Sequence, residues 1–251
     1  MSSIASLPVL LKELKLAGMT KVWQTLAKTA VEEHWLPQDY LASLCEQEAA
    51  DRYHKRVLRH THEAQLPLGK TLSSFDFDAI KSVKKTQMTA LMVDTQWVQR
   101  GENVLLFGPS GVGKTHLAAA IGYALIEKGL RVRFSTATAL VQMLQKARAE
   151  LGLMEALTRL DKYVVLIIDD IGYVKKNEME TQVLFELIAH RYESGSLIIT
   201  SNQAFSDWDQ IFNDNMMTVA AIDRLVHHAC IIQCQEESYR KKQSLQGRSK
   251  K

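Results

Sequence analysis

The stretch Asn103-Val-Leu-Leu-Phe-Gly-Pro-Ser-Gly-Val-Gly-Lys-Thr115 decides the fold class of this chain. Its first part, Asn103–Phe107, is apolar and predicts a buried strand. Its second part, Gly108–Thr115, fits the pattern G-x-x-x-x-G-K-[ST] at every fixed position and opens a predicted helix at Lys114. A strand, a glycine-rich loop and a helix in this order predict a loop that binds the phosphates of a nucleotide.

The residue types in this loop match that chemistry. Glycines let backbone N–H groups come close to phosphate oxygens, and the N-terminus of the helix adds a favourable dipole. The lysine can reach the β- and γ-phosphates, and the threonine hydroxyl can bind Mg²⁺. The predicted nucleotide-binding residues are Gly108, Pro109, Ser110, Gly111, Val112, Gly113, Lys114, Thr115 and His116.

A second apolar segment ends in two acidic residues. The segment Tyr163-Val-Val-Leu-Ile-Ile-Asp169-Asp170 predicts a strand with both acids at its carboxyl end. Ligands of open parallel sheets bind at this edge, so we expect Asp169 to hold Mg²⁺ together with Thr115. Asp170 is then placed to act as a general base or to orient a water molecule. Solvated acids at an ordinary strand end are the alternative, and the neighbouring phosphate loop argues against it.

Outward from the loop, apolar β-type runs alternate with helical runs. Strands are predicted at Val104–Phe107, Arg131–Ser135, Tyr163–Ile168, Leu197–Ser201 and Cys230–Gln233. Helices are predicted from Lys114, between Ala137 and Leu160, over Met179–Glu193 and over Met217–His228. This alternation implies right-handed crossovers and an α/β fold, with a parallel five-stranded sheet between helices.

The chain before the loop has a different pattern. Apolar residues recur there at helical spacing, at Leu10, Leu11, Leu14, Val22 and Leu26. Pro37 suits the first turn of a further helix that can continue to His62. Pro67 and Gly69 then break the periodicity. We therefore predict a small all-helical N-terminal domain over residues 1–66, a P-loop NTPase domain over 67–240 and a basic flexible tail over 241–251.

Composition limits the location and the class of protein. Of 251 residues, 46% are hydrophobic, which is ordinary for a globular core. The longest unbroken apolar run, Tyr163–Ile168, falls far short of the roughly 20 residues that cross a bilayer. Leu7–Leu11 is short and lacks a preceding basic region, so it does not match a secretory signal. We therefore expect a cytoplasmic protein without a membrane partner.

Basic residues suggest contact with double-stranded DNA. One stripe of the long N-terminal helix carries Arg52, Lys55, Arg56 and Arg59. Such a stripe can follow a phosphate backbone without reading sequence, although a solvated helix face is the competing interpretation. Lys175 and Lys176 add a basic loop after the strand-end acids, and the tail after Glu237 contains no acid. The formal net charge of +3 does not indicate a nucleic-acid partner by itself.

A cluster near the last predicted strand invites a metal interpretation. It consists of His227, His228, Cys230 and Cys234. The cysteines lie on a strand-like segment without acidic or histidine partners at ligand spacing. We therefore expect these residues to pack in the core.

Five motifs occur in an order that resembles a known family. They are Lys70-Thr-Leu-Ser-Ser-Phe-Asp-Phe77, the phosphate loop through His116, Leu-Ile-Ile-Asp-Asp-Ile-Gly-Tyr173, Ile-Thr-Ser-Asn202 and Asp-Arg-Leu-Val-His-His228. Together they resemble the IstB helper ATPases of bacterial insertion-sequence transposition, which are AAA+ proteins, and the match runs nearly end to end. The same motifs also resemble the bacterial helicase loader DnaC.

The resemblance implies roles for three further residues. Asn202 matches the sensor residue that responds to the γ-phosphate and the attacking water. Arg224 matches the arginine finger that reaches the ATP of a neighbouring subunit, which implies a homo-oligomer with ATP sites at subunit interfaces. A surface salt bridge is the alternative role for Arg224. Arg240, in the shared motif Ser238-Tyr-Arg240, is a candidate nucleotide contact.

The resemblance also implies an AAA+ domain without the C-terminal helical lid, because few residues follow the last predicted strand. Asp170 departs from the wider AAA+ pattern, in which glutamate is usual at this position, and this leaves the rate of hydrolysis open. A shorter side chain can slow or reposition the activation of water.

The implied function is an ATP-dependent helper of transposition. It would oligomerise on target duplex DNA and deliver this DNA to the transposase of the same insertion sequence. The alternative is a helicase loader that acts mainly through protein contacts. A small-molecule P-loop kinase fits poorly, since it would require a lid and leaves the Asp-Arg-Leu motif unexplained.

Overall fold

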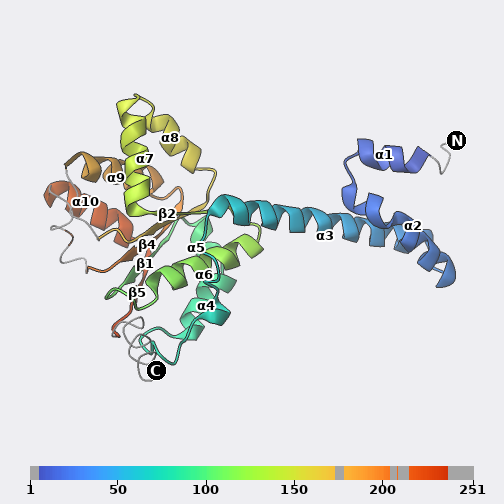
Figure 1. Ribbon diagram of the computed structural model, residues 1–251, viewed down its shortest axis with the longest axis horizontal. Helices are drawn as coiled ribbons and strands as arrows, with labels where there is room; N and C mark the ends of the chain where they lie inside the picture. Colours follow the sequence, from blue (N-terminus) through green and yellow to red (C-terminus); the bar gives the residue numbers. More distant parts are fainter. Residues whose placement is uncertain (1–5, 173–177, 204–207, 209–214, 237–251) are drawn as a thin grey trace, which may run out of the picture. The chain divides into compact units, whose positions relative to one another are not determined.

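The computed structural model describes the backbone of residues 6–172, 178–203, 208 and 215–236, and the side chains of all of these except residues 215–218. The chain divides into two compact units, Met1–Arg59 and His60–Lys251 (Figure 1). This division falls inside helix α3 (Pro37–Ala64), earlier than the predicted boundary after Leu66. The last turn of α3 belongs to the second unit, where the side chains of His60 and Ala64 are buried.

The first unit is helical, as predicted. It contains α1 (Leu7–Glu13), α2 (Ala17–Glu32) and most of α3. The start of α2 is held by the Glu48 carboxylate of α3, which accepts hydrogen bonds from the backbone of Gly18 at 2.7 Å and Met19 at 3.1 Å. A carboxylate at a helix N-terminus satisfies free N–H groups and complements the helix dipole.

The second unit is built on a parallel sheet of five strands, which confirms the predicted α/β class. Its strands lie in the order β2-β3-β4-β1-β5. They are β1 (Asn103–Phe107), β2 (Val132–Thr136), β3 (Val165–Asp169), β4 (Ser196–Ser201) and β5 (Ala229–Gln233). Every residue of β1 and β4 is buried, as expected for central strands that are covered on both faces.

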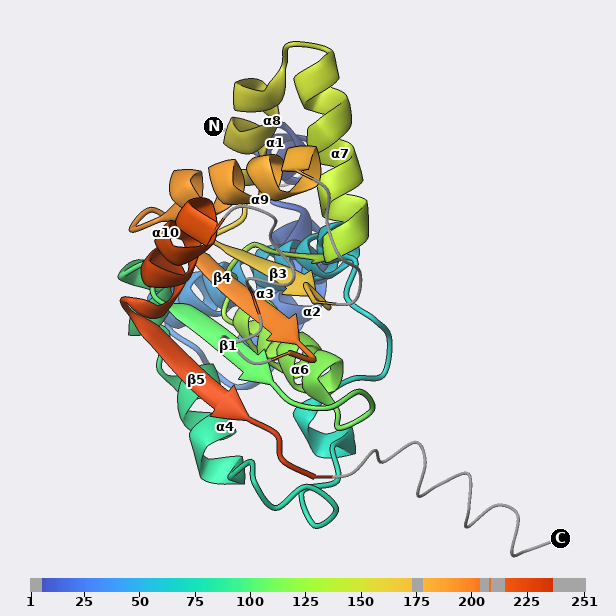
Figure 2. The same cartoon turned by 90° about the vertical axis from the view of Figure 1, so that its left-hand side faces the viewer.

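Helices cover both faces of this sheet (Figure 2). One face carries α7 (Ala137–Ala149), α8 (Leu153–Leu160), α9 (Glu178–Arg191) and α10 (Asn215–Val226). Their apolar side chains form one core with Leu105, Phe107, Leu166 and Ile168 of the sheet. The opposite face carries α6 (Lys114–Glu127) and α4 (Lys85–Val93).

Two short elements before β1 were not predicted as such, α4 and α5 (Gln96–Gln99). The segment before them contains the one-turn helix η2 (Leu72–Ser74). Among the described residues, no helix combines the length and the apolar content that a membrane span requires.

Strand β3 begins at Val165, two residues later than predicted, and a buried arginine binds the backbone before it. Arg191 is 2% exposed, and its guanidinium donates to the carbonyl oxygens of Tyr163 at 2.9 Å and Val164 at 3.1 Å. Gly195 is required beside it, since a Cβ there would lie 2.4 Å from Cζ of Arg191. Backbone acceptors thus bind both terminal nitrogens of the buried guanidinium.

Candidate nucleotide-binding site

The loop between β1 and α6 needs glycine for steric reasons. Gly108 has φ +146°, and a Cβ there would lie 2.1 Å from the carbonyl oxygen of Cys234. Gly113, at the start of α6, has φ +88°, and a Cβ there would lie 2.7 Å from the ring of Phe75. A side chain at either position would collide with Cys234 or Phe75, so steric hindrance explains why the pattern has glycine at both.

The end of β5 forms one wall of this loop. The backbone N–H of Cys234 donates to the carbonyl oxygen of Phe107 at 2.7 Å, directly before Gly108. Burial raises the pKa of the Cys234 thiol to about 11, so the group stays protonated at neutral pH. Cys234 is therefore a packing residue, as the sequence predicted.

Lys114 is held on the loop by its ammonium group. Its Nζ donates to the carbonyl oxygens of Gly108 at 2.7 Å and Pro109 at 2.8 Å, and the residue is 8% exposed. These hydrogen bonds fix the buried ammonium in place and offset the cost of its burial. The positive charge thus lies at the loop, where the sequence predicts phosphate binding.

Asp169 lies between two hydroxyl groups. Its Oδ2 accepts a hydrogen bond from Oγ1 of Thr115 at 3.1 Å, and its Oδ1 accepts one from Oγ1 of Thr200 at 2.7 Å. The structure therefore brings together Thr115 and Asp169, the two predicted metal ligands. Their oxygen atoms are the ligand type that Mg²⁺ prefers.

Thr200 is a site residue that the sequence analysis missed. It stands on β4, whose register pairs Ile199 with Ile168 of β3, so that Thr200 lies beside Asp169. Besides Asp169, its Oγ1 accepts a hydrogen bond from the backbone N–H of Asp170 at 2.8 Å. Thr200 belongs to the site because β4 pairs with β3 in the sheet. The sequence alone does not reveal which strands are neighbours.

Asp170 adopts an unusual backbone conformation. Its φ is +65°, in the left-handed region that side-chain-bearing residues rarely enter and that aspartate enters more readily than most. The following residue, Ile171, donates its N–H to the carbonyl oxygen of Thr200 at 3.0 Å. Thr200 therefore anchors both sides of this turn, through its side chain and its backbone.

These groups line one cavity of about 350 Å³. The residues from the predicted site are Ser110, Gly111, Gly113, Lys114, Thr115, His116, Asp169, Asp170 and Asn202. The segment before α4 completes the lining with Lys70, Ser74, Phe75, Asp76 and Ile80. All of these residues belong to the second unit. The cavity therefore joins a phosphate loop, two strand-end acids and a partly aromatic wall.

His116 fastens this wall to the loop. Its Nε2 donates to the carbonyl oxygen of Thr71 at 2.8 Å and lies 3.2 Å from Oγ of Ser74. Its ring meets that of Phe75 edge to face, with 5.2 Å between the ring centres. His116 lines the cavity, and its hydrogen bonds go to the segment before α4.

This chain has relatives among known proteins. It matches the family described as "IstB-like ATP binding protein" over residues 9–247, which is nearly its whole length. This chain belongs to the IstB-like ATP-binding protein family.

Relatives of this IstB-like chain are found among proteins named for insertion sequences. A protein of Sinorhizobium fredii named as an insertion sequence ATP-binding protein is 49% identical over 244 residues, covering 97% of this chain and 82% of the relative. A protein of Pseudomonas aeruginosa named as an ATP-binding protein of insertion sequence IS21 is 37% identical over 237 residues. The match covers 94% of this chain and 89% of the relative.

Solved structures show the same fold at low identity. DnaI superposes with a TM-score of 0.56 at 20% identity, over 72% of this chain and 98% of DnaI. The DnaC helicase loader superposes with a TM-score of 0.53 at 21% identity, over 66% of this chain and 97% of DnaC. The IstB-like chain therefore has the AAA+ fold, as its motifs indicated.

Arg224 of the IstB-like chain lies outside the cavity. It stands near the end of α10, which leads into the amino end of β5, whereas the phosphate loop follows the carboxyl end of the parallel strand β1. Its Nη1 donates to the carbonyl oxygen of Ala220 at 3.1 Å, and its guanidinium lies 5.3 Å from the ring centre of Phe185. Arg224 therefore does not take part in the site of its own chain.

The basic stripe of α3 is partly neutralised within the first unit. Arg52 pairs with Glu48, and Lys55 pairs with Asp51, both at 2.6 Å. Hydrogen bonds from Lys21 and Lys55 lower the pKa of Asp51 to about 2. The stripe also contains Arg56 and Arg59, which are exposed and form no ion pair with any described residue. Only part of the predicted stripe is therefore an unpaired cationic surface.

Some predicted residues lie outside the described parts of the chain. They are the predicted DNA contacts Lys175 and Lys176, the predicted nucleotide contact Arg240 and the basic tail. The prediction that no helical lid follows β5 also concerns residues outside the described parts. For His227 and His228 the prediction of core packing was wrong, because both are exposed at the end of α10. They follow the last turn of that helix instead of facing the sheet.

Proposed function

We propose that this IstB-like chain binds ATP with Mg²⁺ and hydrolyses ATP to ADP and phosphate. The observation that carries the proposal is the pairing of Thr115 with Asp169 beside the Lys114 ammonium. Backbone N–H groups of the loop and the ammonium of Lys114 would bind the phosphates. The hydroxyl of Thr115 and the carboxylate of Asp169 would hold Mg²⁺, which supplies positive charge to the β- and γ-phosphate oxygens when bound.

Two polar residues at the cavity would serve hydrolysis. Asp170 lines the cavity and would accept a proton from the attacking water or orient this water. Asn202 lines the same cavity one residue after β4, where its amide can contact the γ-phosphate. Thr200 positions the acids through its hydrogen bonds to both.

A homo-oligomer would complete the ATP site of each subunit. Because Arg224 stands apart from its own cavity, it would serve as the arginine finger for the ATP of a neighbouring subunit. An arginine supplied from a second subunit stabilises charge on the transferred phosphoryl group and makes hydrolysis depend on the homo-oligomer.

We further propose that the oligomer forms on double-stranded DNA and delivers this DNA to the transposase of the same insertion sequence. The names of the relatives support the link to insertion sequences. The exposed Arg56 and Arg59 support contact with phosphates, and repeated weak contacts along an oligomer add to a high affinity. The protein would act in the cytoplasm, where it meets both ATP and DNA.

A helicase loader is the second candidate, favoured by the fold that the chain shares with DnaC and DnaI. A loader would bind a helicase through its N-terminal unit and have little affinity for duplex DNA. A pull-down with each class of partner separates the two functions.

The particle size of the purified chain tests the leading proposal. Sedimentation would be measured with ATP, with duplex DNA, with both and with neither. We expect large particles only when ATP is present, and the largest when DNA is added. Lys114→Ala should stay small and lose ATP binding, whereas Lys128→Ala, at the exposed far end of α6, should assemble normally. A wild-type chain that stays monomeric with ATP and DNA would contradict the proposal.

Mixing tests whether subunits share the site. Arg224→Ala should bind ATP but hydrolyse it poorly, because the charge it supplies is missing from the neighbouring cavity. Lys114→Ala lacks a working cavity but retains Arg224. Partial recovery of hydrolysis in a mixture of the two variants supports sharing, and no recovery at any ratio contradicts it.

A further inference from the structure

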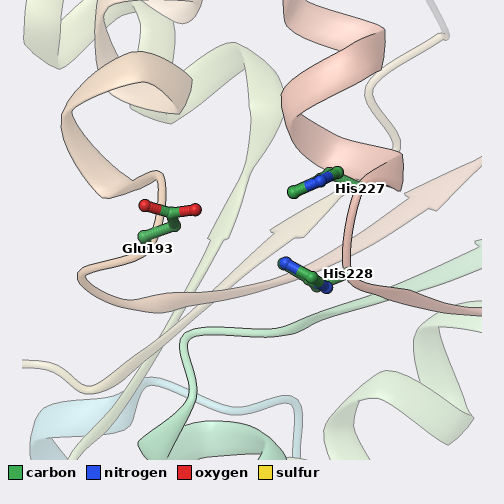
Figure 3. Close-up of side chains that lie close together, drawn as sticks. All are labelled: Glu193, His227 and His228. Carbon is green, nitrogen blue, oxygen red and sulfur yellow. The ribbon is translucent and has the colours of Figure 1, made fainter.

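Three side chains gather at the edge of the sheet opposite the nucleotide cavity. Glu193 lies in the connection from α9 to β4, and His227 and His228 lie in the connection from α10 to β5. The potential ligand atoms of these residues all lie within 4.8 Å of one another, and all three residues are exposed. Figure 3 shows the Glu193 carboxylate on one connection facing the two imidazoles on the other.

A buried asparagine holds the two connections in place. Asn103 is 8% exposed, and its Oδ1 accepts a hydrogen bond from the N–H of Leu197 at 2.9 Å. Its Nδ2 donates to the carbonyl oxygen of Leu225 at 3.1 Å. The backbone N–H of Asn103 donates to the carbonyl oxygen of His228 at 2.9 Å. Asn103 therefore ties the start of β4 to the end of α10 and anchors the backbone next to the two histidines to the core.

A hydrogen bond orients the first imidazole. The hydroxyl of Tyr192 lies 3.0 Å from Nδ1 of His227, so Nε2 of this ring would be the nitrogen that binds an ion. Metal-binding histidines are commonly oriented in this way by a partner on their other nitrogen. The contact between the imidazoles, with 4.1 Å between ring centres, keeps both rings in the same small space.

We propose that Glu193, His227 and His228 form a binding site for a divalent transition metal ion, with Zn²⁺ as its preferred occupant. Two imidazoles and one carboxylate are an established zinc ligand set, in which water takes the fourth position. Imidazole nitrogen favours zinc, nickel or cobalt over magnesium, which prefers oxygen ligands. The site would therefore select a different ion from the one at the nucleotide cavity.

The ion would fasten the ends of two helices. It would link the connection after α9 to the end of α10, the helices that carry Phe185 and its partner Arg224. Since the ion binds the folded arrangement and not the separated chain segments, occupancy should raise the midpoint of thermal unfolding. This effect does not require ATP or DNA.

Titration of the untagged, full-length protein with Zn²⁺ tests the proposal, with excess Mg²⁺ present and nucleotide absent. We expect one tight zinc site per chain, a rise in the unfolding midpoint, and tetrahedral d–d absorption when Co²⁺ replaces Zn²⁺. The variant His227→Ala/His228→Ala should lose at least about tenfold in zinc affinity, together with the cobalt spectrum.

Two further variants separate metal binding from damage to the fold. Glu193→Gln keeps the size and hydrogen-bonding capacity of the side chain but removes its charge, and it should also bind zinc at least about tenfold more weakly. His190→Ala, which removes an imidazole of α9 bound to Asp161, should leave zinc affinity unchanged. Equal zinc affinity in the wild type and the ligand variants, or no cobalt spectrum in the wild type, would overturn the proposal.

Discussion

The nucleotide cavity of the second unit and the basic stripe of α3 in the first unit are both sites of charge, but they are built differently. At the cavity, Lys114 and Asp169 are fixed by hydrogen bonds to the loop and to hydroxyl groups. On the stripe, Arg52 and Lys55 are paired with acids of their own unit and remain in contact with solvent. The first site is positioned by the core, and the second is an exposed surface.

This difference determines how strongly a single substitution should affect each site. A group fixed by a buried scaffold cannot be replaced by a neighbour, so its loss should abolish a step. Exposed charges act additively through a screened field, and each contributes little. The expected effects of substitution therefore range from loss of binding at the loop to modest changes on α3.

The largest effect is expected for Gly108→Ala. The added Cβ would meet the Cys234 carbonyl oxygen at 2.1 Å, so the loop and the end of β5 must separate. We expect the free energy of unfolding to fall by about 3 kcal/mol or more, with loss of ATP binding. Urea denaturation and nucleotide titration measure both. Gly69→Ala, at φ +73° with nothing within 4 Å, is the matched control and should cost only about 1 kcal/mol.

A large catalytic effect is expected for Asp170→Asn. Asparagine also tolerates the left-handed backbone at this position, so the fold and ATP affinity should be retained. Loss of the carboxylate should slow hydrolysis by about 100-fold, measured as phosphate release at saturating ATP. Asp78→Asn, at an exposed acid that does not line the cavity, is the control. Normal turnover in the Asp170 variant would exclude the proposed role in activating water.

A smaller effect is expected for Thr200→Val. The substitution keeps the shape of the side chain but removes the hydroxyl that orients Asp169 and the backbone of Asp170. We expect a loss of about tenfold to 100-fold in Mg²⁺-dependent hydrolysis, as for other groups that support a metal ligand. Thr158→Val, which removes an exposed hydroxyl of α8, provides the comparison. Equal magnesium dependence in both variants would show that Thr200 only packs.

The smallest effect is expected on α3. Arg56→Ala/Arg59→Ala should reduce the slope of log affinity for duplex DNA against log salt by about 2, with a moderate loss of affinity. Arg52→Ala/Lys55→Ala should change the slope less, because these side chains are already paired with Glu48 and Asp51. If all four substitutions together leave affinity and slope unchanged, this stripe is not a DNA-binding surface.

The two regions also differ in how far the sequence could predict them. The cavity residues Lys114, Thr115 and Asp169 were predicted because phosphate chemistry dictates both residue type and spacing. Thr200 was missed, since its role follows from the position of β4 between β1 and β3, which is set by tertiary structure. The aromatic wall at Phe75 was likewise known only as part of a motif, and its contact with Gly113 is non-local.

Surface groups were harder to predict for a related reason. Periodicity places Arg52, Lys55, Arg56 and Arg59 on one side of a helix, but it does not tell which of them find acidic partners. The exposed imidazoles of His227 and His228 were assigned to the core because adjacent cysteines suggested packing. Their relation to Glu193, far away in the sequence, appears only when two connections meet at one edge of the sheet.

The left-handed turn at Asp170 bears on the choice of acid at this position. With φ at +65°, the peptide chain bends immediately after β3, and Asp and Asn enter this backbone region more readily than most residues. Aspartate therefore suits this bend better than most residues with a side chain. A longer acid at position 170 would have to adopt the same backbone angle, so Asp170→Glu should lower the free energy of unfolding more than Asp170→Asn.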